Sequence, residues 1–332
     1  MKYNSIKKKH TNKNHKMLSA MNILITKEIS SHIRSWRFLI LVLLILLTFC
    51  ASTFVSFSGL KQSLNNMQDP DRTFVYLKIL TSSDGTIPPF HVFLNFLAPL
   101  LGIALGFDAI NTEQNTGTIT RLLSQPIYRD NLLISKFIAP LIIVSILFTS
   151  LVLFMLGAGI LSTGINIEFQ EVLRIFGFII LSIFYVGFWL SLALLFSIVF
   201  RQAATSALTC IGIWLFFTVF FPILVNLAVR AFMPNPNYIS QQEYLEWNDI
   251  IINMMRLSPS QLYSDATTSI LMPSVRSLGP ISMEQMIAAL PIPLSFYDSI
   301  MIVWPQITGI TAAMMICFAL SYFIFMKREI RC

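Results

Sequence analysis

Six long apolar stretches dominate the pattern of hydrophobic and polar positions along the chain. A helix needs about 20 apolar residues to cross a bilayer, because each residue advances it by about 1.5 Å. Backbone groups in lipid must find partners within their own segment, so each stretch is expected to be helical. The pattern predicts an all-α integral membrane protein with six transmembrane helices. They cover Phe38–Phe57, His91–Phe107, Phe137–Leu161, Ile175–Phe200, Ala203–Leu227 and Ile307–Met326.

The composition supports this fold class and excludes a soluble domain. Of the 332 residues, 55% are hydrophobic and 12% are charged. A soluble domain of this size cannot bury so much apolar surface, so part of its solvent must be lipid. The first apolar stretch is too long for a cleaved signal peptide, and no clean cleavage site follows it. We therefore expect a multi-pass protein of the cell membrane.

The distribution of charge predicts the orientation. If both termini are cytoplasmic, the inside segments hold 16 Lys and Arg against 5 Asp and Glu, and the outside segments hold 7 against 11. This is the positive-inside pattern. It places 108–136 inside and puts Lys61–Pro89, Ser162–Arg174 and Val229–Pro305 outside as loops. The basic balance then reports on topology and lipid, and no nucleic-acid partner is expected because Lys7–Lys9 lack a binding fold.

The N-terminal region divides into a tail and a helix. Residues 1–20 are polar and basic and are predicted to be disordered, with Met1, Met17 and Met21 all open as translation starts. Residues 21–332 then form one six-span domain. Met21–Arg37 predicts a helix whose apolar face carries Ile25, Ile29, Ile33 and Trp36. This suits a helix lying in the membrane interface, and a plain extension of the first span stays open as the alternative.

The largest outside segment, 229–305, is predicted to be mostly helical and packed on the membrane face. Tyr238–Arg256 has the pattern of an amphipathic helix, and Ser282–Leu290 is a second candidate with Ser282 as its N-cap. The apolar residues Ile250, Ile251, Met254 and Met255 need burial. Trp304 and Pro305 suit the mouth of the last span, with Pro in its first turn.

Several signatures of chemistry are absent from the sequence. There is no G-x-x-x-x-G-K-[ST] to cradle ATP phosphates, and no H-E-x-x-H or G-x-S-x-G of common hydrolases. The four Cys and four His show neither a disulfide framework nor metal-ligand spacing. The six apolar stretches contain no Asp, Glu, Lys or Arg, whereas an ion-coupled carrier usually needs one at mid-membrane. Energy for transport must therefore enter from another protein.

A patterned polar stretch, 107–136, separates the second and third spans. Asp108 closes the second span, and Gly117 permits a turn that a side chain would hinder. Thr118–Leu123 predicts about two turns of helix. Its apolar side carries Ile119, Leu122 and Leu123, its other side carries Arg121, and Pro126 ends it. Asp130 or Asn131 would cap the third span, with Arg129 and Lys136 anchoring the inner leaflet. Exposed apolar residues favour a docking surface over a merely solvated loop.

This stretch resembles the cytoplasmic loop of type-2 ABC exporter permeases. The matching residues are Phe107-Asp108, Glu113, Gly117-Thr118, Leu122-Leu123-Ser124, Pro126, Arg129 and Lys136. Phe323–Arg331 resembles the exit of the family's last span. Leu257-Ser258-Pro259-Ser260 is similar to an outer-loop motif of the branch that serves copper-enzyme maturation and multidrug or peptide export. The resemblance runs from Met21 to Arg331, and Gln114 departs from it where many relatives carry a charge.

The resemblance implies a permease subunit that is not itself an enzyme. It implies two separate ABC ATPase subunits, which hold ATP and Mg, and a second permease copy or paralogue; no cofactor is expected in this chain. The implied coupling residues are Asp108, Glu113, Gly117, Thr118, Ile119, Arg121, Leu122, Leu123, Pro126 and Arg129. The absence of charge in the spans hints at an apolar or amphiphilic cargo, without naming it.

Two other interpretations stay open at this point. A membrane scaffold or sensor would use the same docking loop without transporting anything, and a secondary carrier is disfavoured by the charge-free spans. Copper handling by the methionines of the outside segment is a weak third idea, since Met more often serves as packing. An adjacent gene for an ATP-binding cassette protein would favour the exporter.

Overall fold

The computed structural model describes residues 21–64, 74–83, 85, 87–118, 129–232, 240–274 and 293–327. Across these residues the chain is nearly all helical and contains no strand. Six helices in the described part are long and apolar enough to cross a membrane, which confirms the predicted fold class. They are Trp36–Ser58, Phe90–Asn115, Arg129–Thr163, Phe169–Val199, Ala203–Phe232 and Phe296–Lys327.

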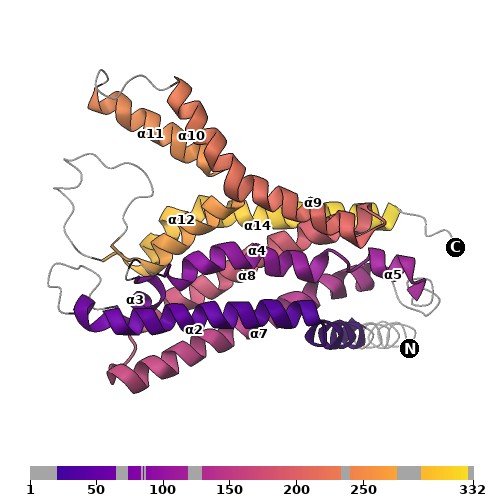
Figure 1. The fold of residues 1–332 in the computed structure, drawn as a ribbon, viewed down its shortest axis with the longest axis horizontal. Helices are drawn as coiled ribbons and strands as arrows, with labels where there is room; N and C mark the ends of the chain where they lie inside the picture. The colour runs from indigo at the N-terminus through magenta and orange to yellow at the C-terminus, as the bar shows by residue number, and fades with distance from the viewer. Residues whose placement is uncertain are drawn as a thin grey trace, which may run out of the picture.

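Figure 1 shows the long helices running side by side along one axis. Residues 21–33 are helical and precede α2. The other elements are α2 (Trp36–Leu64), α3 (Val75–Thr81), α4 (Phe90–Gly106), α5 (Asn111–Asn115), α7 (Arg129–Thr163), α8 (Phe169–Val199), α9 (Ala203–Leu215), η1 (Phe216–Phe220), α10 (Phe221–Phe232), α11 (Gln241–Met255), α12 (Pro259–Leu271) and α14 (Phe296–Lys327). Helix 21–33, α5 and the end of α14 lie at one end of the bundle, here called the α5 end. The opposite end, which holds α3, is called the α3 end.

The core is built around α8, which packs against α4, α7 and α14. Two glycines one turn apart allow α4 to approach it closely. A Cβ on Gly102 would lie 2.7 Å from the Val186 carbonyl oxygen and 2.9 Å from the Trp189 Cβ. A Cβ on Gly106 would lie 2.8 Å from the Ala193 Cβ. Small residues at such crossings let two backbones gain van der Waals contact, which matters in lipid because burial from water offers no driving force.

Several helices begin earlier than the apolar pattern predicted. The expected loop Ser162–Arg174 is wrong over much of its length, because α8 starts at Phe169 and Glu168 and Glu171 form its capping box. Glu171 and Arg174 are therefore buried charges within a spanning helix, at 1% and 0% exposure. Likewise α14 starts at Phe296, so Pro305 lies inside the helix and not in its first turn.

The expected loop Lys61–Pro89 is also partly helical. Helix α2 continues to Leu64, and α3 is an almost fully buried helix whose amides face Glu171: the Tyr76 amide donates to Glu171 Oε1 at 2.9 Å. A carboxylate at a helix N-terminus is favoured by the helix dipole and by unpaired N–H groups. Buried helix α12 was likewise not predicted, although its first residues belong to the motif Leu257-Ser258-Pro259-Ser260.

The predicted amphipathic helix within Tyr238–Arg256 is confirmed as α11, with a Ser240–Glu243 capping box. The predicted burial of its apolar face is wrong for the isolated chain, because the side chain of Ile250 is 49% exposed and that of Met254 is 39% exposed. Helices α10 and α11 form a hairpin that rises away from the bundle (Figure 1), so α11 packs on α10 and not on the membrane-spanning core. The second candidate, Ser282–Leu290, lies outside the described residues, as does the tail 1–20.

Candidate functional site

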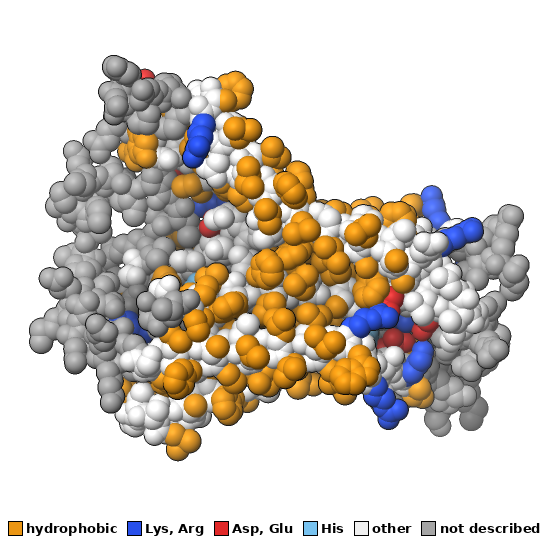
Figure 2. Space-filling view, viewed as in Figure 1, with side chains coloured by type: hydrophobic (Ala, Val, Ile, Leu, Met, Phe, Trp, Pro, Cys, Tyr) orange, Lys and Arg blue, Asp and Glu red, His pale blue; other side chains and the backbone are white. Residues whose placement is uncertain are grey.

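Charged side chains gather at the α5 end of a largely apolar face (Figure 2). Four of them form what we call the charged cluster: Lys27 and Glu28 of helix 21–33, Glu113 of α5 and Lys136 of α7. Helix 21–33 reaches this position because residues Arg34 and Ser35 break it from α2. That break favours a separate helix over a plain extension of the first span.

Each carboxylate of the charged cluster lies between two ammonium groups. Lys136 Nζ is 2.9 Å from Glu113 Oε1 and 3.4 Å from Glu28 Oε2. Lys27 Nζ is 3.3 Å from Glu113 Oε1 and 3.2 Å from Glu28 Oε1. Lys136 and Glu28 are buried, at 3% and 5% exposure, so neither charge could be held there without its partners. The charged cluster therefore ties three separate elements into one unit.

The pKa values of Glu28 and Lys27 follow from this arrangement. Burial alone would raise the pKa of the Glu28 carboxyl, but the positive charges of Lys136 and Lys27 outweigh burial and lower it. Burial would lower the pKa of the Lys27 ammonium, and the carboxylates of Glu28 and Glu113 reverse this and raise it. Both groups are thus held in their charged forms at neutral pH.

A second ion pair lies beside the charged cluster. The guanidinium of Arg37, at the start of α2, pairs with the carboxylate of Asp108, just after α4. The same guanidinium lies 5.0 Å above the centre of the Phe107 ring, which adds a cation–π contact. These contacts connect the first span to the second at the point where 107–136 begins.

Helix α5 is also fixed to the last turn of α8 and to the residues that join α8 to α9. The buried Ser197 hydroxyl accepts hydrogen bonds from the amides of Ile110 and Asn111, at 2.9 Å and 3.3 Å. The Asn115 side-chain amide donates to the Arg201 carbonyl at 2.9 Å. A short helix of this kind has little stability of its own, so these side-chain contacts hold it in place.

The sequence model of the ABC-2 family transporter proteins matches residues 21–330. The chain belongs to this family. It is a permease of an ABC transporter and a multi-pass protein of the bacterial plasma membrane. Membership also implies association with ABC ATPase subunits.

Two curated relatives of this permease carry the same description, "Probable ABC transporter permease protein NosY". The one from Stutzerimonas stutzeri is 26% identical over 230 residues, which cover 68% of this chain and 76% of the relative. The one from Pseudomonas aeruginosa is 29% identical over 185 residues, which cover 55% of this chain and 63% of the relative. The resemblance drawn from the loop residues is therefore confirmed at the level of the family.

The structure brings some predicted coupling residues of the permease together. Glu113 belongs to the charged cluster, and Asp108 lies beside it in the pair with Arg37. Gly117 has a φ of +68°, the conformation expected for a turn that favours glycine. Thr118, the next residue, has helical backbone geometry, and Arg129 is the first residue of α7. Ile119, Arg121, Leu122, Leu123 and Pro126 lie outside the described residues.

Other residues of the site were missed or misread from the sequence. Lys136 was expected to anchor the inner leaflet, but its ammonium is buried among carboxylates. Lys27, Glu28, Asn115 and Ser197 were not predicted at all. One signal was available for Glu28, because it is the sole acidic residue among the first 37 and stands four positions after Leu24 on the helix face that proves to be buried.

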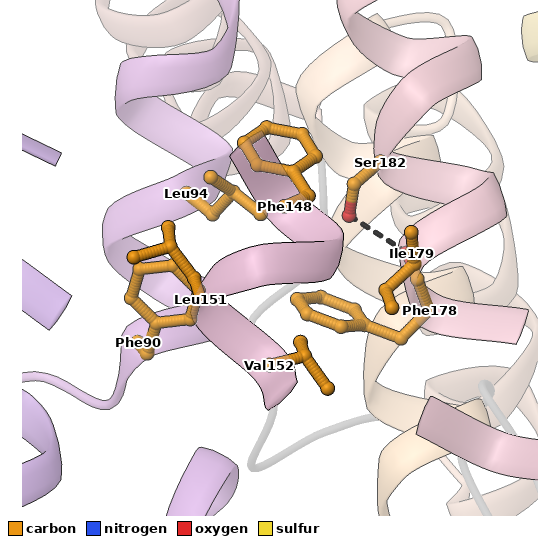
Figure 3. Close-up of a pocket in the computed structure, with 8 residues that line it drawn as sticks. All are labelled: Phe90, Leu94, Phe148, Leu151, Val152, Phe178, Ile179 and Ser182. Atoms are coloured by element: carbon orange, nitrogen blue, oxygen red, sulfur yellow. Dashed lines mark hydrogen bonds between the residues drawn. The ribbon is translucent and has the colours of Figure 1, made fainter. Parts of the chain in front are cut away.

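The permease also contains an apolar pocket between α4, α7 and α8 (Figure 3). Ser182 is its single polar lining residue. The Ser182 hydroxyl donates to the Phe178 carbonyl at 2.7 Å, so its 2.8 Å contact with Tyr263 is a bond that the tyrosine donates. The Ser182 hydroxyl therefore has no hydrogen left to donate to a cargo, and the other seven side chains that line the pocket are apolar.

Proposed function

We propose that this permease is the membrane subunit of an ATP-driven exporter and that the α5 end is its cytoplasmic, ATPase-facing end. The observation that supports this most directly is the position of the charged cluster. Two of its members, Glu113 and Lys136, flank the predicted docking helix Thr118–Leu123 in the sequence, and the cluster joins α5 to α7 and to helix 21–33. A displacement applied to this segment would be passed to three elements together.

Buried ion pairs suit such a transmission role because separating the two charges is costly. Apolar side chains can slide past one another at little cost, whereas a buried carboxylate that leaves its ammonium partners loses several kcal/mol. Movement of α5 therefore carries Glu113, and Glu113 carries Lys136 of α7. Ser197 links the same helix to the end of α8, the central helix of the bundle.

The docking surface itself is proposed from the sequence. Ile119, Leu122 and Leu123 would enter a groove on an ATPase subunit, while Arg121 would lie at its polar rim. ATP and Mg would be held by the ATPase subunits, which would hydrolyse ATP outside this chain. Closure of the ATPases would push the α5 end and switch a pathway between this chain and a second permease copy or paralogue. The cargo stays unassigned.

The test uses the permease reconstituted with its ATPase subunits in lipid vesicles. Leu122→Asp and Leu123→Asp should abolish association, because each puts an unpaired charge into an apolar contact. Leu122→Met is the matched control and should associate normally. Lys136→Met should behave differently, retaining association but uncoupling ATP hydrolysis from transport.

Three results would count against the proposal. If both aspartate variants keep full association and transport, the docking helix is wrongly assigned. If Lys136→Met transports normally, the charged cluster does not transmit movement. If the wild-type complex binds its ATPase but moves no cargo across the vesicle, the chain is a scaffold or sensor.

A further inference from the structure

The fifth span changes its helical register halfway along. It runs from α9 through η1 to α10, and η1 is a π-helical segment over Phe216–Phe220. The amide of Phe221 bonds to the carbonyl of Phe216, five residues back, which is the π pattern. The next residue is Pro222, which has no amide hydrogen and whose ring clashes with the carbonyl four residues before it. A π segment is one of the ways in which a spanning helix accommodates a proline.

This arrangement leaves the Phe217 carbonyl without a donor in its own helix. Its donor in the α register would be the amide of Phe221, which already bonds to Phe216. Its donor in the π register would be residue 222, which is proline. Burying a carbonyl without a partner is costly, and in lipid no water is at hand to replace it. The donor instead comes from another element: the Ser258 hydroxyl donates to the Phe217 carbonyl at 3.2 Å.

Ser258 occupies the N-cap of α12, but its side chain makes no capping bond to that helix. Pro259, at the first helical position, has no amide hydrogen, so the first turn of α12 has one unpaired amide fewer to satisfy. A serine has one hydroxyl hydrogen, and Ser258 gives its own to Phe217. The 2.7 Å contact between Ser258 and Ser260 must then be donated by Ser260. In the motif Leu257-Ser258-Pro259-Ser260, the Ser260 hydroxyl thus donates to Ser258, and the Ser258 hydroxyl donates to the Phe217 carbonyl of the fifth span.

The elements on the two sides of this bond differ in how firmly they are held. Helix α12 is fixed in the bundle: its Ile270 carbonyl accepts from Arg174 at 2.8 Å, and its Tyr263 ring stacks on Tyr185 at 4.3 Å. Beyond η1, α10 buries one residue, Val225, and α11 buries none among the residues whose exposure is described. Figure 1 shows α10 and α11 rising away from the bundle while α12 lies along it.

We propose that Phe216–Phe220 is a hinge in the fifth span and that the Ser258 hydroxyl is its latch. When the latch is closed, Phe217 is satisfied and the α10–α11 hairpin is held at one angle to the bundle. When it opens, the π segment can rearrange, and the hairpin swings while α12 stays in place. This device lies halfway along the fifth span and is independent of how the permease is coupled to an ATPase.

The test measures the distance between α9 and α11 in the purified, full-length permease in lipid nanodiscs. Spin labels replace Leu208 and Ile250, which are 73% and 49% exposed, in a background with all four cysteines replaced by alanine. Double electron–electron resonance should give one narrow distance distribution for this parent. Ser258→Ala should add a displaced second population, and Ser258→Thr, which keeps the hydroxyl, should not. Ser269→Ala removes another buried hydroxyl from the same helix and should leave the distribution unchanged.

A second substitution separates the latch from a general loss of packing. Pro222→Ala restores the missing amide, so the Phe217 carbonyl regains a donor within its own helix. The single narrow population should therefore be present in Pro222→Ala and also in the double variant with Ser258→Ala. The proposal is overturned if Ser258→Ala gives the parent distribution, or if the double variant keeps the second population of Ser258→Ala.

Discussion

Lys136 Nζ lies 2.9 Å from Glu113 Oε1, and this contact joins the third span to the short helix that precedes the predicted docking segment. The lysine is 3% exposed and also faces Glu28, so a single ammonium serves two carboxylates from two other elements. Lys136 is thus the member of the charged cluster that joins α7 to both α5 and helix 21–33, whereas Lys27 joins helix 21–33 to α5.

Lys136→Met should release helix 21–33 from the bundle. The substitution leaves Glu28 and Glu113 close together with only Lys27 between them, and breaking a buried pair in this way costs on the order of 3 kcal/mol. Hydrogen exchange of the amides over 21–33 should become faster in the purified permease. Arg34→Met, which removes an exposed positive charge from the same end, is the control and should leave exchange unchanged. Equal protection in the Lys136 variant and the wild type would contradict this role.

Docking of helix 21–33 should weaken as pH falls below about 6.5, through His32. Burial lowers the pKa of His32; Glu28 and Asp108 oppose this and Lys136 adds to it, with a net lowering. His32 therefore binds a proton less readily in the docked helix than in the free helix. The contribution of neutral His32 to docking is fully present above its ordinary pKa and is lost as pH falls through its lowered pKa. The Glu28 carboxyl also has a lowered pKa, so its protonation weakens docking only below about pH 4.5.

The range from pH 7.5 to pH 5.5 thus isolates the histidine from the carboxylate. The intrinsic exchange reaction slows as pH falls, so the rates over 21–33 are corrected for it; the corrected exchange should rise across this range, and this rise is the excess that His32 explains. His32→Gln should abolish the excess, because glutamine does not titrate. An excess that persists in His32→Gln would assign the pH dependence to another group.

Gly106→Ala should loosen the contact between α4 and α8. The added methyl group would lie 2.8 Å from the Ala193 Cβ, and neither backbone can move without disturbing the other. Overpacking of this kind costs about 1–3 kcal/mol. The matched control is Gly212→Ala in α9, where nothing lies within 4 Å and the higher helix propensity of alanine should be neutral or favourable. Thermal unfolding in detergent, followed by size-exclusion chromatography, should rank Gly106→Ala below the wild type and Gly212→Ala at or above it.

The spans of this permease were predictable from the sequence because apolar run length is a local property. Their ends were not, because the charges that end an apolar run are satisfied by residues far away in the chain. Arg174 donates to the carbonyls of Ile270 and Leu294, and Glu171 accepts from the amide of Tyr76. A window centred on residue 170 contains none of these partners, so it assigns the first turns of α8 to a loop.

The candidate site divides in the same way. Asp108, Glu113 and Gly117 were predictable because they lie together in one loop with a turn signal and a family resemblance. Lys27 and Glu28 were not, because the partner of Lys27 on α5 is 86 positions away in the sequence. Helix α12 was missed because its buried face includes Thr267 and Ser269, which a search for apolar periodicity counts as polar.

Gly117→Val should impair the complex with the ATPase without affecting the membrane domain. The φ of Gly117 is +68°, and forcing a residue with a Cβ into this region costs roughly 1–2 kcal/mol, more for a β-branched one. The residues that follow would be presented in the wrong direction, so association with the ATPase should fall by roughly 5-fold to 30-fold. Gly117→Asn should recover most of this association, since asparagine tolerates positive φ.

The control is Gly157→Val in α7, where nothing lies within 4 Å of the added Cβ and the backbone stays helical. Binding measured by surface plasmon resonance with nanodisc-embedded permease distinguishes these variants. If valine and asparagine at position 117 bind the ATPase equally well, the direction of the chain after Gly117 does not matter, and the coupling segment must be sought elsewhere at the α5 end.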